Sequence, residues 1–164
     1  MKMIKYYAGV GSRKTPPDVL RKMTACAKWL QALSVCLRSG GAAGADSAFE
    51  AGSNDLKEIF LAGQATGEAL VMASRVHPAW HRCSEYAKNL HARNCFQVFG
   101  RGLDDPVGFV VCWTPCGSER TSECGIATGG TGTAIRLADN AGIPVFNMRN
   151  GPVRERIEKL LATK

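Results

Sequence analysis

The sequence predicts a three-layer α/β protein, a Rossmann-like open parallel sheet of about five strands with helices on both faces. Three observations predict this class. Strand-like and helix-like segments alternate along the chain, which is the order expected of a parallel sheet. The run over 107–113 is almost wholly apolar, as in a strand that is buried on both faces. Glycine-rich loops lie between strand ends and helix starts, where such sheets bind ligands.

The first strand and helix have clear local signals. Residues 4–10 are rich in β-forming side chains and lead into a glycine turn, which indicates a strand. Thr15 precedes two prolines, and Thr at an N-cap with Pro in the first turn is typical of a helix start. Apolar residues then recur at helical spacing, so a helix is predicted over 17–34.

The next elements are shorter. A strand over 35–38 ends at two glycines, and a helix over 44–51 is predicted to stop at Gly52. Residues 57–61 again have the composition of a strand. The segment 62–82 is the least regular part of the chain, and no element is predicted there.

The second half repeats the alternation. A helix is predicted over 83–100, and the buried strand over 107–113 leads into a polar loop over 114–128. A helix over 131–141 is predicted to stop at Gly142. The last strand and helix are predicted over 143–146 and 152–163.

Length and composition narrow the class of protein. The chain has 164 residues, of which 45% are hydrophobic and 21% are charged. We therefore expect one domain over 1–164 with a substantial core, and not a disordered chain. No apolar run approaches the ~20 residues that span a membrane, and the first residues lack the apolar segment of a secretory signal. A cytoplasmic location is expected.

The positive charge is concentrated near the N-terminus. Residues 1–38 contain eight basic residues and one acid, which is +7, whereas the remaining 13 basic and 13 acidic residues cancel. A localised basic excess points to an anionic partner. The other interpretation is a solvated basic face on one helix, and the residues alone leave both open.

The cysteines do not indicate a disulfide framework. There are seven, an odd number, and none forms a Cys-x-x-Cys pair. His77, His81 and Cys83 lie close together in the sequence, but their spacing fits no standard zinc pattern. We therefore expect no metal and no cofactor.

Three glycine-rich segments are the main functional signal. They cover 9–13, 39–46 and 129–133, and together they contain eight of the 18 glycines. Each lies between a strand and a helix, and the carboxyl ends of parallel strands meet at one edge, so the three loops should share one rim. Glycine backbone and helix N-termini offer N–H groups to phosphate. No Walker loop or strict dinucleotide fingerprint is present.

Hydroxyl and guanidinium groups within these loops complete the predicted cradle, and Arg13 adds a charge-assisted donor. The alternative for Arg13 is a surface cation. Asp46 either contacts a ribose or base, or offsets the dipole of the helix that it begins. The predicted phosphate-binding residues are Gly11, Ser12, Arg13, Ser39, Gly40, Gly41, Gly44, Gly130, Thr131, Gly132 and Thr133.

Two of these loops resemble a known family. Residues 11–13, with Thr15 shortly after, and residues 39–46 resemble the two glycine-rich loops in the Rossmann domain of the DNA-processing protein A family (DprA/Smf). The resemblance implies a nucleotide-binding fold and, through the basic N-terminal segment, binding of single-stranded DNA as one candidate activity. The additional domains of that family have no counterpart here.

The C-terminal half resembles a second family. Leu90-His91-Ala92-Arg93-Asn94 is similar to the Met-His-x-Arg-Lys helix of the LONELY GUY (LOG) nucleotide phosphoribohydrolases, and 129–133 is similar to their Pro-Gly-Gly-x-Gly-Thr-x-x-Glu loop. The resemblance implies that Arg93 binds the ligand. The position of the catalytic Glu is Arg136 in this chain, which argues against hydrolysis unless Asp46, Glu50 or Asp139 replaces that carboxylate.

Both families belong to the SLOG superfamily, and over about 4–150 the chain resembles small stand-alone SLOG proteins of bacteriophages. This resemblance implies a homo-oligomer in the host cytoplasm that senses or sequesters a signalling nucleotide in counter-defence. We therefore predict a protein that binds a nucleotide or nucleotide-derived small molecule, with Asp46 and Arg93 added to the predicted residues. The alternatives are a nucleoside-monophosphate phosphoribohydrolase and a DprA-like protein that binds single-stranded DNA. No membrane partner is expected.

Trp113 either stacks on a base or belongs to the core.

Overall fold

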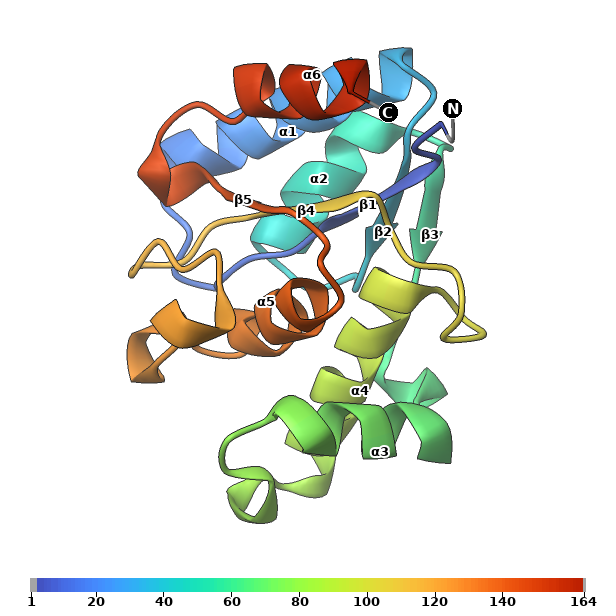
Figure 1. Cartoon of the computed structure of the whole chain (residues 1–164), viewed down its shortest axis with the longest axis vertical. Coiled ribbons are helices and arrows are strands. Elements are labelled where there is room, and N and C mark those ends of the chain that lie inside the picture. Colours follow the sequence, from blue (N-terminus) through green and yellow to red (C-terminus); the bar gives the residue numbers. More distant parts are fainter. Residues whose placement is uncertain (1–2, 164) are drawn as a thin grey trace.

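The computed structural model describes residues 3–163, which form a five-stranded sheet and six α-helices (Figure 1). The strands are β1 (Tyr6–Gly9), β2 (Cys36–Ser39), β3 (Lys57–Ile59), β4 (Phe109–Cys112) and β5 (Val145–Asn147). The helices are α1 (Pro17–Ala32), α2 (Ala45–Ser53), α3 (Gly67–Val76), α4 (Glu85–Phe99), α5 (Thr131–Asn140) and α6 (Arg154–Ala162).

All neighbouring strands are parallel, in the order β3-β2-β1-β4-β5. From β1 the chain moves outward through β2 to β3, and then crosses back to place β4 on the other side of β1. The predicted α/β class with five strands is therefore confirmed. The strand order reverses between β1 and β4, and ligands of such sheets bind beyond the carboxyl ends of the strands at this point.

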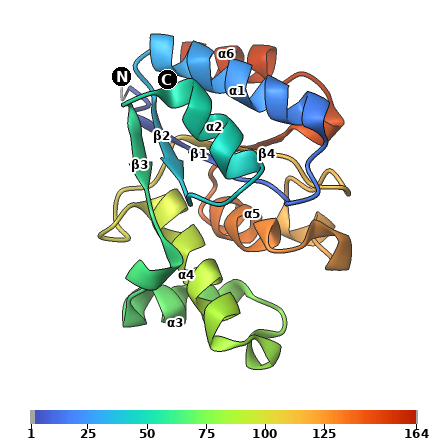
Figure 2. The same cartoon turned by 180° about the vertical axis from the view of Figure 1, so that it is seen from behind.

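Helices cover both faces of the sheet. One face carries α1, α2 and α6, and the other carries α4 and α5, with α3 packed outside α4 (Figures 1 and 2). Successive side chains of a strand belong to two different hydrophobic cores, one on each face of the sheet. Tyr7 packs with Phe49 and Phe109 in the core of the first face, and Ala8 belongs with Phe96 to the core of the second face. Every residue of β4 is buried, as its continuous apolar run predicts.

Two predicted helix ends differ from the structure. The residue that caps α1 is Pro16, and the Thr15 hydroxyl instead donates to the Ser12 carbonyl. Gly52 does not stop α2, because the helix continues one residue further. A Cβ at Gly52 would lie 2.3 Å from the Thr24 carbonyl oxygen, so this glycine allows α1 and α2 to pack closely.

The segment 62–82, for which no element was predicted, contains α3 and a short 3-10 turn at Trp80–Arg82. The Thr66 side chain caps α3 by accepting a hydrogen bond from the Ala69 N–H group at 3.3 Å. Ala69 and Ala73 are completely buried one turn apart, and they form the seam between α3 and α4. Within residues 3–163, no helix is long and apolar enough to cross a membrane.

Candidate functional site

The first glycine-rich loop, after β1, packs tightly against its neighbours. The Ser12 N–H donates to the Trp113 carbonyl at 3.2 Å, which attaches the loop to the end of β4. A Cβ at Gly11 would lie 2.5 Å from the Cβ of Ala45, at the start of α2. Gly11 therefore serves close packing at the reversal of the strand order.

Helix α4 joins the second and third loops through two successive residues. Arg93 donates from Nη1 to the Gly40 carbonyl at 3.2 Å, and Asn94 donates from Nδ2 to the Gly130 carbonyl at 3.3 Å. Together with the contacts of the first loop, these bonds bring all three glycine-rich segments to one edge of the sheet. The geometry agrees with the predicted common rim.

Arg93 is incompletely paired. Its Nε is buried and has no hydrogen-bond partner, and no carboxylate within residues 3–163 lies within 4.0 Å of its guanidinium. A Cβ at Gly40 would lie 2.6 Å from this Nε, so the glycine lets the guanidinium lie against the loop. The Asp46 carboxylate acts on Arg93 electrostatically without forming an ion pair within 4.0 Å, so the guanidinium keeps an N–H donor for an anion.

Asp46 lies on the other side of Gly40. Its Oδ2 accepts a hydrogen bond from the Ala42 N–H at 3.1 Å, and the side chain is almost fully buried. Burial raises the pKa of Asp46 to about 6, although Arg93 and the Ala42 N–H oppose the increase. One carboxylate oxygen therefore organises the loop, and the group changes charge at a mildly acidic pH.

Unsatisfied polar atoms gather at this second loop. Five buried side-chain atoms lack a hydrogen-bond partner in the described part of the chain, and three of them surround residues 39–46. These three are Ser39 Oγ, Glu50 Oε1 and Arg93 Nε. Glu50 Oε1 would lie 4.0 Å from a Cβ at Gly41. Such atoms are normally paired in native proteins, so their concentration here marks a place where a polar ligand would complete the bonding.

The loop glycines differ in their roles. Gly41 and Gly44 have φ angles of +69° and +88°, which favour glycine, and Gly44 precedes α2 directly. Arg13 is exposed and forms no ion pair with any described residue. It remains a candidate phosphate ligand.

The third loop supplies fewer free donors than its sequence suggests. The N–H groups of Gly132 and Thr133 donate to the Gly129 and Gly130 carbonyls, so they are occupied. Thr131 is buried at the helix start. Only the beginning of α5 therefore offers N–H groups to a ligand.

His91 fixes the start of α5 to α4. Its Nδ1 is 2.8 Å from the Thr133 Oγ1. Burial, assisted by the nearby His77 and by the positive charge of Arg93 and Arg136, lowers the pKa of His91 to about 4. The imidazole is therefore neutral at pH 7 and acts as a hydrogen-bonding group.

Trp113 belongs to the core. It is 8% exposed and packs among the apolar side chains beneath α1 and α6. The interpretation as a core aromatic is therefore the one that the geometry favours, and Trp113 is not presented to a ligand as a stacking surface.

Cys116 is a feature that the sequence did not single out. Its thiol is exposed just beyond β4 and lies 2.9 Å from the Ser118 hydroxyl and 3.3 Å from the Thr128 hydroxyl. Desolvation alone would raise its pKa, but these hydrogen bonds outweigh it and lower the pKa to about 7. Ser118 is a neighbour in the sequence, but Thr128 is twelve residues away, so spacing alone could not predict the combined effect.

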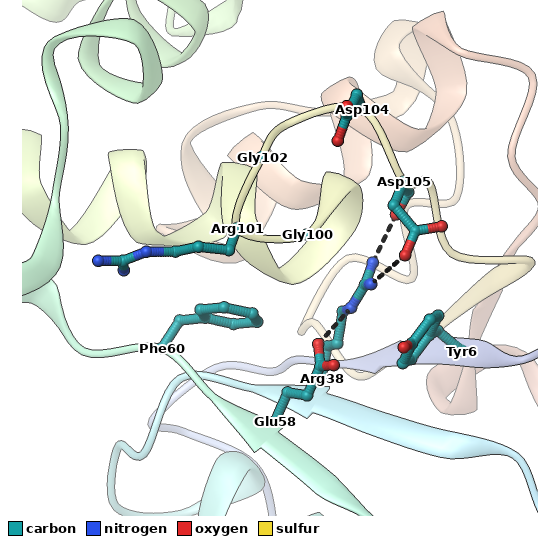
Figure 3. A pocket seen from close by; sticks show the side chains of 9 residues that line it. All are labelled: Tyr6, Arg38, Glu58, Phe60, Gly100, Arg101, Gly102, Asp104 and Asp105. Atoms are coloured by element: carbon teal, nitrogen blue, oxygen red, sulfur yellow. Dashed lines mark hydrogen bonds and ion pairs between the residues drawn. The ribbon is translucent and has the colours of Figure 1, made fainter.

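A separate hollow lies between β2, β3 and the segment 100–105 that follows α4 (Figure 3). Arg38 occupies it, and Figure 3 shows its guanidinium between Glu58 and Asp105. Nε donates to Glu58 at 2.9 Å and Nη2 to Asp105 at 2.8 Å, while Nη1 donates to the Asp105 carbonyl. The Tyr6 ring centroid lies 3.8 Å from its Cζ. This arginine is fully paired, so the hollow lacks the unmet bonding of the glycine-rich edge.

Comparison with known proteins adds no assignment: no protein-family model, curated protein or solved structure matches the chain.

Proposed function

We propose that this protein binds a nucleotide or nucleotide-derived small molecule, with its phosphate lying between the 39–46 loop, Arg93 and the start of α5. The observation that carries the proposal is the Arg93 guanidinium, which is partly buried, forms no ion pair within 4.0 Å and has an unpaired Nε. A buried N–H donor without an acceptor is unfavourable. A phosphate would accept this free N–H and pair with the guanidinium.

The surroundings of Arg93 suit the same ligand. The unpaired Ser39 hydroxyl can donate to a phosphate oxygen, and the start of α5 adds the positive end of a helix dipole. The free carboxylate oxygen of Asp46 can accept from a ribose hydroxyl. The similarity of these loops to SLOG proteins points the same way, and it suggests a signalling nucleotide as the ligand class.

The first experiment is to identify what the protein binds. Mass spectrometry of small molecules that co-purify with the native protein would be combined with thermal-shift measurements against AMP, GMP, cyclic AMP and ADP-ribose. We expect at least one phosphorylated ligand. If no nucleotide co-purifies and none of the four raises the melting temperature, the proposal is wrong.

Arg93→Met then tests the site. We expect it to weaken the affinity for the nucleotide found roughly 10–100-fold, as the loss of a hydrogen bond to a charged group does. The matched control is Arg101→Met, an exposed arginine that follows α4 and lines the separate hollow, which should leave the affinity unchanged. Equal losses in both variants would indicate general electrostatic attraction.

Hydrolysis of the ligand is a second candidate, and Asp46 favours it. A buried carboxyl group with a pKa of about 6 suits a general acid or base. The discriminating assay incubates nucleoside monophosphates with the protein and measures the free base by chromatography. Base release that is lost in Asp46→Asn would establish the phosphoribohydrolase, whereas binding without release leaves a binding protein.

A further inference from the structure

Three side chains that are separate in the sequence meet beside α4. His77 follows α3, Cys83 follows the Trp80–Arg82 turn and His91 lies on α4. Their ligand atoms all lie within 4.8 Å of one another. The Cys83 Sγ is 3.7 Å from the His77 Nε2, and the two imidazole centroids are 4.4 Å apart. All three side chains are half-buried, so the fold has gathered them into one enclosed cluster.

The distances suit a zinc ion. Zinc binds thiolate sulfur at ~2.3 Å and imidazole nitrogen at ~2.0–2.1 Å, and tetrahedral geometry then separates sulfur from nitrogen by ~3.6 Å. The distance between Sγ and the His77 Nε2, 3.7 Å, is close to that value. The two ligand atoms that are farthest apart must approach each other by roughly 1 Å. A shift of the short 3-10 turn that precedes Cys83 would bring the Sγ atom closer.

The surroundings orient one imidazole for this role. The His91 Nδ1 is occupied by the Thr133 hydroxyl at 2.8 Å, which leaves Nε2 for a metal. Histidine ligands of metals commonly have their second nitrogen held in this way. In His77, the Ala79 N–H donates to Nδ1 at 3.1 Å. Zinc binding at the Nε2 of His77 therefore moves the ring proton to Nδ1 and releases this hydrogen bond.

We propose that His77, Cys83 and His91 bind a Zn²⁺ ion through three protein ligands, with the fourth position open. The Cys83 thiol loses its proton to solvent on binding, because the thiolate is the ligand. Arg136 is close enough to act electrostatically on both imidazoles. A second cation beside the ion favours an anionic oxygen at the fourth position. The ion would fasten the α3–α4 connection to α4, and through Thr133 it would steady the start of α5.

The test is metal binding by the chelator-treated full chain. Titration with Co²⁺ should give the absorption of a thiolate-bound, tetrahedral ion, and calorimetry with Zn²⁺ should give one ion per chain. Cys83→Ser should abolish the thiolate band and weaken Zn²⁺ binding ~100-fold or more, since even an outer partner contributes ~10–100-fold. Thr133→Val, which removes such an outer partner, should weaken binding ~10-fold.

The controls are an exposed histidine and an exposed cysteine outside the cluster. His81→Ala and Cys116→Ser should retain full affinity, because both side chains are exposed and neither belongs to the cluster. Circular dichroism confirms folding of each variant, and His77→Gln replaces Cys83→Ser if the latter does not fold. The proposal is overturned if the wild type binds no Zn²⁺, if the cluster variants bind as well as the wild type, or if Cys116→Ser loses the same affinity as Cys83→Ser.

Discussion

Two substantially buried arginines, one on β2 and one on α4, are bonded very differently. Arg38, on β2, has a partner for each of its three nitrogens and an aromatic ring beside it (Figure 3). Arg93, at the carboxyl end, has one carbonyl partner and a buried Nε with none. Completed bonding indicates a structural role, and incomplete bonding indicates a place for a ligand. The contrast predicts different consequences when each arginine and its surroundings are changed.

The largest effect is expected at Arg38. Arg38→Met would leave Glu58 and Asp105 without their cation. We expect a loss of roughly 3 kcal/mol in the free energy of unfolding, at the low end for a broken buried pair, because both carboxylates are partly exposed. Urea denaturation measures this loss. Nucleotide affinity should be unchanged in the folded variant, and a parallel loss of affinity would mean that the hollow around Arg38 and the glycine-rich edge are not separate sites.

The next effect is expected at Asp46, where a substitution should increase the free energy of unfolding. A pKa of about 6, against an ordinary 3.8, means that the folded protein holds the proton more tightly than the unfolded chain. Asp46 therefore destabilises the fold increasingly as the pH rises from about 4 to about 6, and fully above that. Asp46→Asn should add roughly 2 kcal/mol of stability at pH 7. The advantage should vanish near pH 4, as measured by unfolding at a series of pH values, and a constant difference would contradict this assignment.

Gly40→Ala tests how closely the glycine-rich edge is packed. The new Cβ would lie 2.6 Å from the Arg93 Nε and 2.9 Å from the Asp46 Oδ2, so both side chains must move. We expect a loss of roughly 1–2 kcal/mol in stability, which is typical of overpacking, together with loss of nucleotide binding. Gly63→Ala is the matched control, because a Cβ there meets nothing within 4 Å. Thermal unfolding of the two variants should separate them clearly.

The smallest effect on stability, and the sharpest test of the edge as a binding site, is Gly130→Ala. Its φ of −62° suits any residue, and its Cβ would meet no protein atom within 4 Å. We expect the stability to change by less than ~0.5 kcal/mol. A loss of nucleotide affinity in calorimetry would then report a clash with the ligand itself. Unchanged affinity would place the phosphate away from the third loop.

The sequence predicted the architecture better than the bonding. Alternation of elements and glycines after strands were enough for the parallel sheet, because both are local signals. α3 was missed, since its apolar face is short and packs on α4 and not on the sheet. The resemblance pointed to Arg93, but its unpaired Nε could not be predicted, because it depends on atoms from distant segments. For the same reason His91 was not grouped with His77 and Cys83.

The two neighbouring contacts of α4 have a mechanical consequence. Successive residues of an α-helix project ~100° apart, yet Arg93 and Asn94 each hold a different loop. A small rotation of the helix about its axis would therefore displace both contacts together. We expect a molecule that moves either the 39–46 or the 129–133 segment to shift the other through α4, across the strand reversal.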